Sequence, residues 1–323
     1  MSKNVTSNLM KIVDFCNLLI TPFIAFMALI QARLGASRLP LSYKIWDYFG
    51  VIPMRYHYYQ PVFNVHKLPD ETWTEAKTMH GIDLNPQDQL ALLQKFNYTS
   101  ELENIPLDQP SESLDFFYNN PSFCSGDAEI LYSMIRHFKP KNFIEIGSGF
   151  STMMAKKALD KNRQEGKPAK HLSIEPYEIP WLEQLHLDKV VREKVEDTDS
   201  LVFKELEEND ILFIDSSHVV RTGGDVVTEY LNILPNLRKG VLVHIHDIFL
   251  PYDYPREWIQ KYRYFWTEQY ILQAFLSYNS SFKVLLALNY LSFNYRDELA
   301  KACPIYASQE GRMLGSFWIQ RVK

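Results

Sequence analysis

The amino-acid sequence predicts an α/β fold on a mostly parallel sheet, with an antiparallel terminal strand and a mainly helical N-terminal extension. First, short apolar runs alternate with helical patterns, which indicates parallel strands joined by right-handed crossovers. The five alternating runs are residues 142–149, 171–176, 189–195, 210–218 and 240–249. Second, two later runs, residues 282–288 and 315–322, have no long helix between them. One of these two is therefore expected to run antiparallel at the edge of the sheet.

Each element has its own local signal. Apolar residues at helical spacing, Ile130, Leu131, Met134 and Ile135, predict a helix that ends before Pro140. The run at 142–149 is continuously apolar and ends in glycines, which is typical of a buried strand followed by a turn. The later runs have the same character, with the one at 189–195 the weakest. Helical patterns follow the first strand and separate the fourth strand from the fifth.

Length and composition exclude several classes of protein. A chain of 323 residues suggests about two domains. With 46% hydrophobic and 23% charged residues, the chain can form a core and is not globally disordered. A net charge of −5 argues against a protein that coats nucleic acid. Three distant cysteines exclude a disulfide framework and a cysteine-rich zinc module, and they suit a reducing compartment.

We expect three segments along the chain. Residues 1–38 form an apolar helical segment that contacts a membrane or is buried. Residues 39–114 form a cap or substrate region, and residues 115–323 form the α/β domain, where the alternating pattern begins. The apolar stretch 15–30 spans about 24 Å as a helix, short of the roughly 30 Å hydrocarbon core, and Pro22 is expected to interrupt it. Peripheral membrane contact, a buried helix or dimer interface, and a true span all stay open.

The turn after the first strand of the sheet has the composition of a ligand-binding loop. Gly147 and Gly149 allow the backbone to approach a ligand closely at a strand-to-helix turn. Thr152 replaces the third glycine of a dinucleotide fingerprint, so this turn is not that motif. The expected ligand-binding residues of this turn are Glu145, Gly147, Ser148, Gly149, Ser151 and Thr152. Glu175 ends the next strand, where an acid can accept hydrogen bonds from ribose hydroxyls.

Polar residues follow the fourth and fifth strands. Asp215 and His218 come after the fourth, and His246 and Asp247 after the fifth. The carboxyl ends of parallel strands are where open α/β sheets bind ligands. Asp215, His246 and Asp247 are therefore candidate ligands for a divalent cation. Carboxylates suit Mg²⁺ or Mn²⁺, and one imidazole shifts the preference toward a transition metal; His244, in mid-strand, is expected in the core.

Together these residues resemble class I S-adenosylmethionine-dependent methyltransferases, and most of all their small-molecule and sugar O-methyltransferase branch. The resemblance covers residues 115–323 and implies a Rossmann-like sheet. It implies that Gly147 and Gly149 flank the methionine part of the cofactor and that Glu175 binds ribose. It places Asp197 near the adenine. The departure from the metal-dependent pattern is His246, which stands where an acid is expected.

The function expected from this resemblance is methyl transfer from S-adenosylmethionine to a hydroxyl of a sugar or another small metabolite. Metal assistance and a membrane-associated glycan acceptor are variants. Asp215, His218 and His246 are the expected catalytic residues, because an imidazole titrates near neutrality and can take the hydroxyl proton. The alternatives left open are a nicotinamide (NAD)-dependent oxidoreductase, an RNA or protein methyltransferase and a non-enzymatic scaffold with the same fold.

Residues outside the shared motifs are expected to select the acceptor. The candidate substrate residues are His57, Asp127, Tyr252, Tyr254 and Trp266. Asp127 also opens a predicted helix, so an N-cap is its alternative role. S-adenosylmethionine is made in the cytosol, so we expect a cytoplasmic protein, associated with the inner face of the membrane if residues 15–30 contact lipid. The expected partners are a small-molecule or glycan acceptor and a second copy of the chain, but no nucleic acid.

Overall fold

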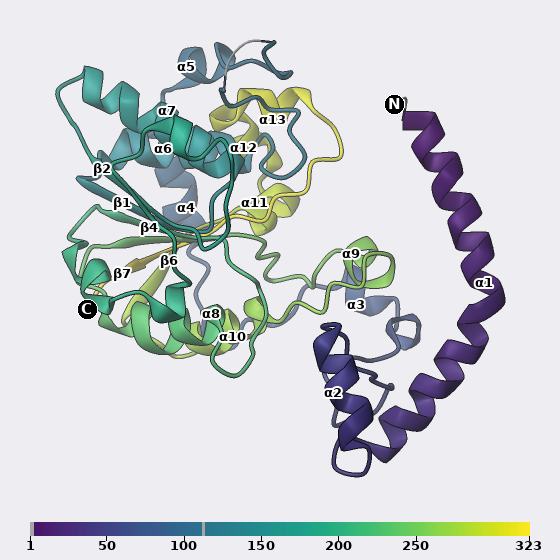
Figure 1. Cartoon of the computed structure of the whole chain (residues 1–323). Helices are drawn as coiled ribbons and strands as arrows, with labels where there is room; N and C mark the ends of the chain where they lie inside the picture. The colour runs from purple at the N-terminus through teal and green to yellow at the C-terminus, as the bar shows by residue number, and fades with distance from the viewer. Residues whose placement is uncertain (1–2, 112–113) are drawn as a thin grey trace. The chain divides into compact units, whose positions relative to one another are not determined.

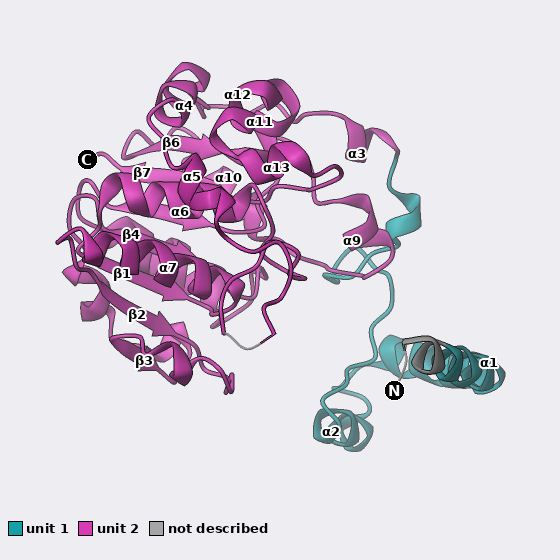
Figure 2. Cartoon of the chain, turned by 90° about the horizontal axis from the view of Figure 1, so that it is seen from above, with its two compact units in different colours: residues 1–69 teal, residues 70–323 magenta. Residues whose placement is uncertain are grey.

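The computed structural model describes residues 3–111 and 114–323. They form two compact units, Met1–Pro69 and Asp70–Lys323, coloured separately in Figure 2. The predicted boundaries between segments of the chain were after residues 38 and 114 instead.

The first unit is dominated by one long apolar helix. Helix α1 (Lys3–Leu34) has 32 residues and is followed by α2 (Pro40–Tyr48) and the short 3₁₀ turn η1 (Val65–Lys67). Pro22 lies inside α1 and does not end it, contrary to the expectation from the sequence. Residues Asn8–Leu34 are long and apolar enough to cross a membrane, and none of that stretch is buried within the protein. Asn8–Leu34 is therefore long enough for a span, whereas the apolar stretch 15–30 by itself is shorter than the hydrocarbon core.

The second unit is built on a seven-stranded sheet with the order β3-β2-β1-β4-β5-β7-β6. Strands β1 to β5 are parallel to one another, and β7 is antiparallel to both β5 and β6. The predicted fold class is thereby confirmed, although the antiparallel strand β7 lies between β5 and β6 and not at the edge of the sheet. The strands are β1 (Asn142–Ile146), β2 (Lys170–Ile174), β3 (Lys189–Val191), β4 (Ile211–Ile214), β5 (Leu242–Ile245), β6 (Phe282–Ala287) and β7 (Phe317–Arg321).

Helices cover both faces of the sheet (Figure 1). Because strand residues alternate between faces, Phe143 and Phe213 belong to one core, while Ile144 and Leu212 belong to the other. The first core lies under α4 (Pro86–Leu93), α6 (Asp127–Phe138), α7 (Phe150–Gln164) and α12 (Arg296–Ala302), and the second under α8 (Asp225–Thr228) and α10 (Glu268–Leu276). The remaining helices of this unit are α3 (Glu71–Thr74), α5 (Thr99–Glu103), α9 (Arg256–Gln260), α11 (Leu288–Asn294) and α13 (Pro304–Ser308).

Part of the predicted cap region belongs to the core of the second unit. Leu92, Leu93 and Leu102 are buried in the core under α6 and α7. The side chain of Gln89 accepts a hydrogen bond of 2.8 Å from the backbone of Ala287 at the end of β6. One core therefore contains residues from both sides of the domain boundary that was predicted at residue 115. The packing partner of α4 at β6 lies some two hundred residues further along the chain.

Candidate active site

Two cavities lie at the carboxyl ends of the parallel strands. The first, of about 360 Å³, is lined by Gly147, Glu175, Glu196 and Asp215, among others. The second, of about 520 Å³, is lined by Asp127, His246, Asp247 and several aromatic side chains. Asp215 borders the first cavity and Asp247 borders the second. Residues that the sequence predicted at neighbouring strand ends therefore lie on two different cavities.

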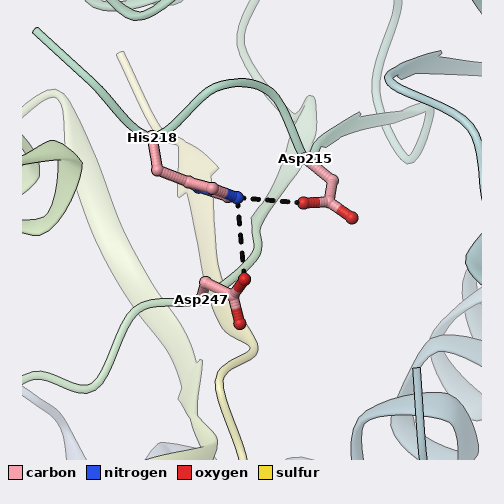
Figure 3. A group of neighbouring side chains, drawn as sticks. All are labelled: Asp215, His218 and Asp247. Carbon is pink, nitrogen blue, oxygen red and sulfur yellow. Dashed lines mark ion pairs between the residues drawn. The ribbon is translucent and has the colours of Figure 1, made fainter. Parts of the chain in front are cut away.

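Three side chains converge between these two cavities, since His218 contacts Asp215 of the first and Asp247 of the second. His218 Nε2 lies 3.3 Å from Asp215 Oδ1 and 3.6 Å from Asp247 Oδ2 (Figure 3). The potential ligand atoms of the three residues all lie within 4.8 Å of one another. Two carboxylates and one imidazole are a suitable donor set for a divalent cation. We call Asp215, His218 and Asp247 the central cluster.

The group of side chains that converges here contains His218, whereas the predicted ligand set contained His246. The side chains of His244 and His246 point to the same face of the sheet, and their rings stack with centroids 5.5 Å apart. His246 thereby faces Phe123 and borders the second cavity, although its Nε2 is still 3.6 Å from Asp247 Oδ1. His244 is a buried core residue beside Ser316, as expected.

His218 is oriented by residues that the sequence analysis missed. Its Nδ1 donates a hydrogen bond of 2.8 Å to Glu268 Oε2. Tyr230 donates from its hydroxyl to the other oxygen of Glu268, at 3.1 Å. Both Glu268 and Tyr230 are fully buried on helices of the second core. A carboxylate behind a ligating histidine fixes the ring so that its other nitrogen faces the ligand site.

The backbone at the central cluster adopts uncommon conformations. His218 and Asp247 both have positive φ, 59° and 55°. Such values are rare for residues other than glycine, and they persist where the surrounding structure imposes them. Two of the three residues of the cluster therefore carry local strain, which supports a functional role for the site.

The charges in the site shift its pKa values strongly. Burial raises the pKa of Asp215, but the neighbouring His246 and His218 outweigh it and lower that pKa to about 2. For His218, burial lowers the pKa, but hydrogen bonds to Asp215 and Glu268 raise it well above its ordinary value. Burial raises the pKa of Asp247. The carboxylates around His218 therefore favour positive charge at the centre of the cluster, and a cation bound there would take the place of the proton on His218 Nε2.

The glycine-rich turn supports the first cavity by a close backbone contact. Gly147 has φ of +85°, and a Cβ there would overlap the carbonyl oxygen of Asp215. Gly149 donates its N–H to Thr152 Oγ1 at 3.0 Å, and Thr152 donates to Glu145 Oε2 at 2.9 Å. Glu145 is fully buried and also contacts His171 Nε2 at 3.2 Å. Glu145 and Thr152 therefore hold the turn in place and do not line the cavity.

The other predicted cofactor residues are placed as follows. Glu175 lines the first cavity and accepts hydrogen bonds from the N–H groups of Ser148 and Tyr177, at 3.1 and 2.9 Å. Ser151 is buried in α7 and is not among the lining residues. Asp197 is exposed, and its neighbour Glu196 lines the cavity instead.

Only part of the predicted substrate set borders the second cavity. Asp127 and Trp266 line it, and Asp127 also accepts hydrogen bonds from the N–H groups of Gly315 and Ser316. Tyr254 is buried and packs beneath Trp266, and Tyr252 packs against Phe293. His57 belongs to the first unit, so its role stays a prediction. The remaining aromatic wall of the cavity consists of Phe249, Trp258, Tyr262 and Tyr264.

Residues 144–248 match a family model described as a methyltransferase domain. An uncharacterized protein of Archaeoglobus fulgidus is 31% identical over 165 residues, covering 47% of this chain and 73% of that protein. Among solved structures, one similar protein is the O-methyltransferase TomG of Streptomyces achromogenes, which is involved in tomaymycin synthesis and was solved with SAM. It is 13% identical, and the match covers 72% of this chain and 89% of the TomG chain with a TM-score of 0.37. An O-methyltransferase of Bacillus cereus solved with SAH is 13% identical, with 73% and 90% coverage and a TM-score of 0.32.

Proposed function

This chain belongs to the class I S-adenosylmethionine-dependent methyltransferases, and we propose that it methylates a hydroxyl of a sugar or another small metabolite with the help of a divalent cation. The observation that carries the proposal is the place of the central cluster. Asp215 borders the first cavity and Asp247 borders the second, with His218 between them. A cofactor in one cavity and an acceptor in the other would meet at this cluster.

The first cavity has the features that a nucleoside cofactor requires. Glu175, at the end of β2, presents a carboxylate that can accept ribose hydroxyls. The tight turn at Gly147 brings backbone close to the end of β4 without a side chain in the way. S-adenosylmethionine supplies an electrophilic methyl group on its sulfonium sulfur. The nicotinamide alternative loses its basis, since the family match is to a methyltransferase domain.

The central cluster fits a divalent cation, which would lower the pKa of a coordinated hydroxyl. Asp215, His218 and Asp247 would hold it, and Glu268 would keep His218 Nε2 turned toward it. We therefore assign His218 a ligand role in place of His246. The acids of the cluster would also become balanced by the added positive charge.

His246 is the residue best placed to accept the hydroxyl proton. It borders the second cavity, and its buried Nδ1 has no hydrogen-bond partner among the residues that the structure describes. In the reaction, a bond forms between the acceptor oxygen and the methyl carbon as the carbon–sulfur bond breaks. The hydroxyl proton passes to His246, and the products are a methyl ether and S-adenosylhomocysteine.

The aromatic wall of the second cavity suits a ring with one apolar face. Tyr264 and Trp266 stack with centroids 4.7 Å apart and planes at 13°. Trp258 meets Trp266 edge to face at 5.2 Å. Such a wall can cover the C–H face of a sugar or an aromatic ring, while Asp247 of the central cluster borders the same cavity.

We propose further that α1 attaches the protein to the inner face of a membrane. Leu18, Leu19, Ile20, Phe23 and Ile24 are all exposed, and successive helical residues are turned by about 100°, so the helix is apolar all round and not on one face. A helix apolar on every face is more suited to insertion in lipid than to lying on a surface. A membrane-associated glycan intermediate would be a natural acceptor for an enzyme anchored in this way.

Calorimetric titration with S-adenosylhomocysteine, with and without Mn²⁺ or Mg²⁺, is the first test. We expect micromolar binding, followed by S-adenosylhomocysteine production from a panel of hydroxylated sugars that stops when EDTA is added. The double variant Asp215→Asn, Asp247→Asn should lose turnover. Asp160→Asn, at an exposed carboxylate on α7, serves as the matched control. Absence of S-adenosylhomocysteine binding would favour the scaffold alternative, and turnover by the double variant would remove the cation from the proposal.

A further inference from the structure

We infer that the acceptor carries a carboxylate or phosphate group and that Arg312 binds this group in the second cavity. The inference rests on the proposed function, because it describes the molecule that the second cavity holds. Arg312 lines this cavity together with Asp247 of the central cluster. The acceptor would thus be held at two points, its hydroxyl at the cluster and its anionic group at Arg312.

The guanidinium of Arg312 is held in place by neutral groups only. Its Nε donates to Gln309 Oε1 at 2.8 Å, and its Nη2 donates to Asn119 Oδ1 at 2.8 Å. Its Nη1 lies 3.3 Å from Cys124 Sγ. A guanidinium has five N–H donors. Three of them are engaged in these contacts, so two remain for a ligand.

The groups that hold Arg312 are themselves fixed by hydrogen bonds. Gln309 Oε1 accepts from Ser125 Oγ at 2.7 Å, and Gln309 Nε2 donates to Asn119 Oδ1 at 3.1 Å. Asn119 Nδ2 donates in turn to Asp108 Oδ1 at 2.9 Å. The guanidinium is therefore positioned before any ligand arrives, which reduces the entropy cost of binding one.

The positive charge of Arg312 has no carboxylate partner among the described residues. Among the described residues, no carboxylate lies within ion-pair distance of its guanidinium. Glu257, which also lines the cavity, pairs with Lys261 at 2.6 Å instead. Asp247 and Asp127 lie on the same cavity, where a cation at the central cluster would balance Asp247. A half-buried guanidinium with free donors and no acid partner favours a planar or tetrahedral oxyanion.

Cys124 offers a test that does not require the acceptor to be known. It lines the second cavity beside Arg312 and can be alkylated by iodoacetate, an anion, or by iodoacetamide, which is neutral. The ratio of the two rates cancels any change in the reactivity of the thiol itself. We expect Arg312→Gln to lower the iodoacetate-to-iodoacetamide ratio at Cys124 roughly fivefold, because it removes the neighbouring positive charge. Mass spectrometry of the full chain in detergent measures both rates.

Four controls accompany the alkylation. The exposed Cys16 of α1 reports the ratio outside the cavity, which Arg312→Gln should leave unchanged. Arg256→Gln removes an exposed arginine that pairs with Asp70 and should not change the ratio at Cys124. Arg312→Lys keeps the positive charge and should retain most of the wild-type ratio. Equal S-adenosylhomocysteine affinity in wild type and variants confirms that they are folded.

Protection by ligands then separates the two kinds of anion. Glucuronate or glucose 1-phosphate should slow the alkylation of Cys124 by iodoacetamide in the wild type and not in Arg312→Gln, whereas glucose should protect less. Protection by glucuronate alone assigns a carboxylate, and protection by glucose 1-phosphate alone assigns a phosphate. An unchanged alkylation ratio in Arg312→Gln, or equal protection by glucose, overturns the inference while leaving the proposed function intact. Failure of S-adenosylhomocysteine to bind the wild type would instead overturn the proposed function.

Discussion

His218 depends for its orientation on Glu268, which lies fifty positions further along the chain. The hydrogen bond from Nδ1 to this buried carboxylate leaves Nε2 facing Asp215 and Asp247. Tyr230 holds the other oxygen of Glu268. Glu268 is therefore a positioning residue, since it acts on the cluster through His218.

Substitution Glu268→Gln tests this role. The amide keeps the shape but weakens the bond to His218, so we expect turnover to fall about 10- to 100-fold and the cation concentration for half-maximal activity to rise. S-adenosylhomocysteine affinity should stay unchanged. Titration of activity with Mn²⁺ measures the effect, and Tyr230→Phe, which spares the bond to His218, should show a smaller one. Lower thermal stability with an unaltered metal requirement would make Glu268 merely structural.

The two glycines of the turn after β1 make a matched pair. Gly147 has positive φ, and a methyl group there would overlap the Asp215 carbonyl, whereas nothing lies within 4 Å of a Cβ at Gly149. We expect Gly147→Ala to lower the free energy of unfolding by more than about 2 kcal/mol and to displace Asp215. Gly149→Ala should cost less than about 1 kcal/mol. Denaturant unfolding of both variants measures the difference, and equal losses would contradict the assigned backbone contact.

At the scale of the elements, Arg136 joins three helices around the first core. Its side chain is buried in α6 and contacts Glu101 of α5 at 2.9 Å and Glu165, just after α7, at 2.5 Å. It also bonds to Asn162 of α7. Replacing Arg136 leaves these carboxylates without their donor, but the side chains of Glu101 and Glu165 are 24% and 38% exposed, so water screens part of the loss. Arg136→Met is therefore expected to lower the free energy of unfolding by about 2 kcal/mol, as measured in urea.

The same cluster predicts a dependence of stability on pH. Partial burial raises the pKa of Glu101, but hydrogen bonds from Arg136 and Tyr132 outweigh it and lower that pKa below the usual value. Arg136 lowers the pKa of Glu165 to about 2. Because both folded-state pKa values are depressed, their stabilisation is present above the ordinary carboxylate pKa and is lost as the pH falls toward 2. Stability measured from pH 6 to 2 should fall less steeply in Arg136→Met, and parallel curves would contradict this.

At the scale of the whole molecule, the two units differ in how they bury apolar side chains. The second unit has two cores, one on each face of its sheet. The first unit leaves the apolar side chains of α1 exposed. Deletion of residues 1–69 should therefore yield a soluble chain with unchanged S-adenosylhomocysteine affinity, whereas the full chain should sediment with membranes and need detergent. Sedimentation of the shortened chain with membranes would place lipid contact in the second unit.

Much of the site could be predicted from the sequence because the apolar pattern of buried strands recurs along the chain. Buried strands appear as short apolar runs, and the residues after them must share one edge of a parallel sheet. Asp215, Asp247, Glu175 and Gly147 were identified in this way, and all four border the two cavities. The antiparallel last strand was expected because the sequence shows no long helix between the last two apolar runs, and the structure has only the short helices α11, α12 and α13 there.

Contacts between distant segments were not predictable in this way. We propose His218 and not His246 as the cation ligand for two reasons. Strand alternation turns His246 toward Phe123, and a left-handed backbone at His218 turns its side chain to the cluster. Glu268 and Arg312 reach the site from segments that carry no local signal, and α4 joins the core through β6. Sequence periodicity specifies which face of an element is apolar, but the partner of that face is set by packing between segments far apart in the chain.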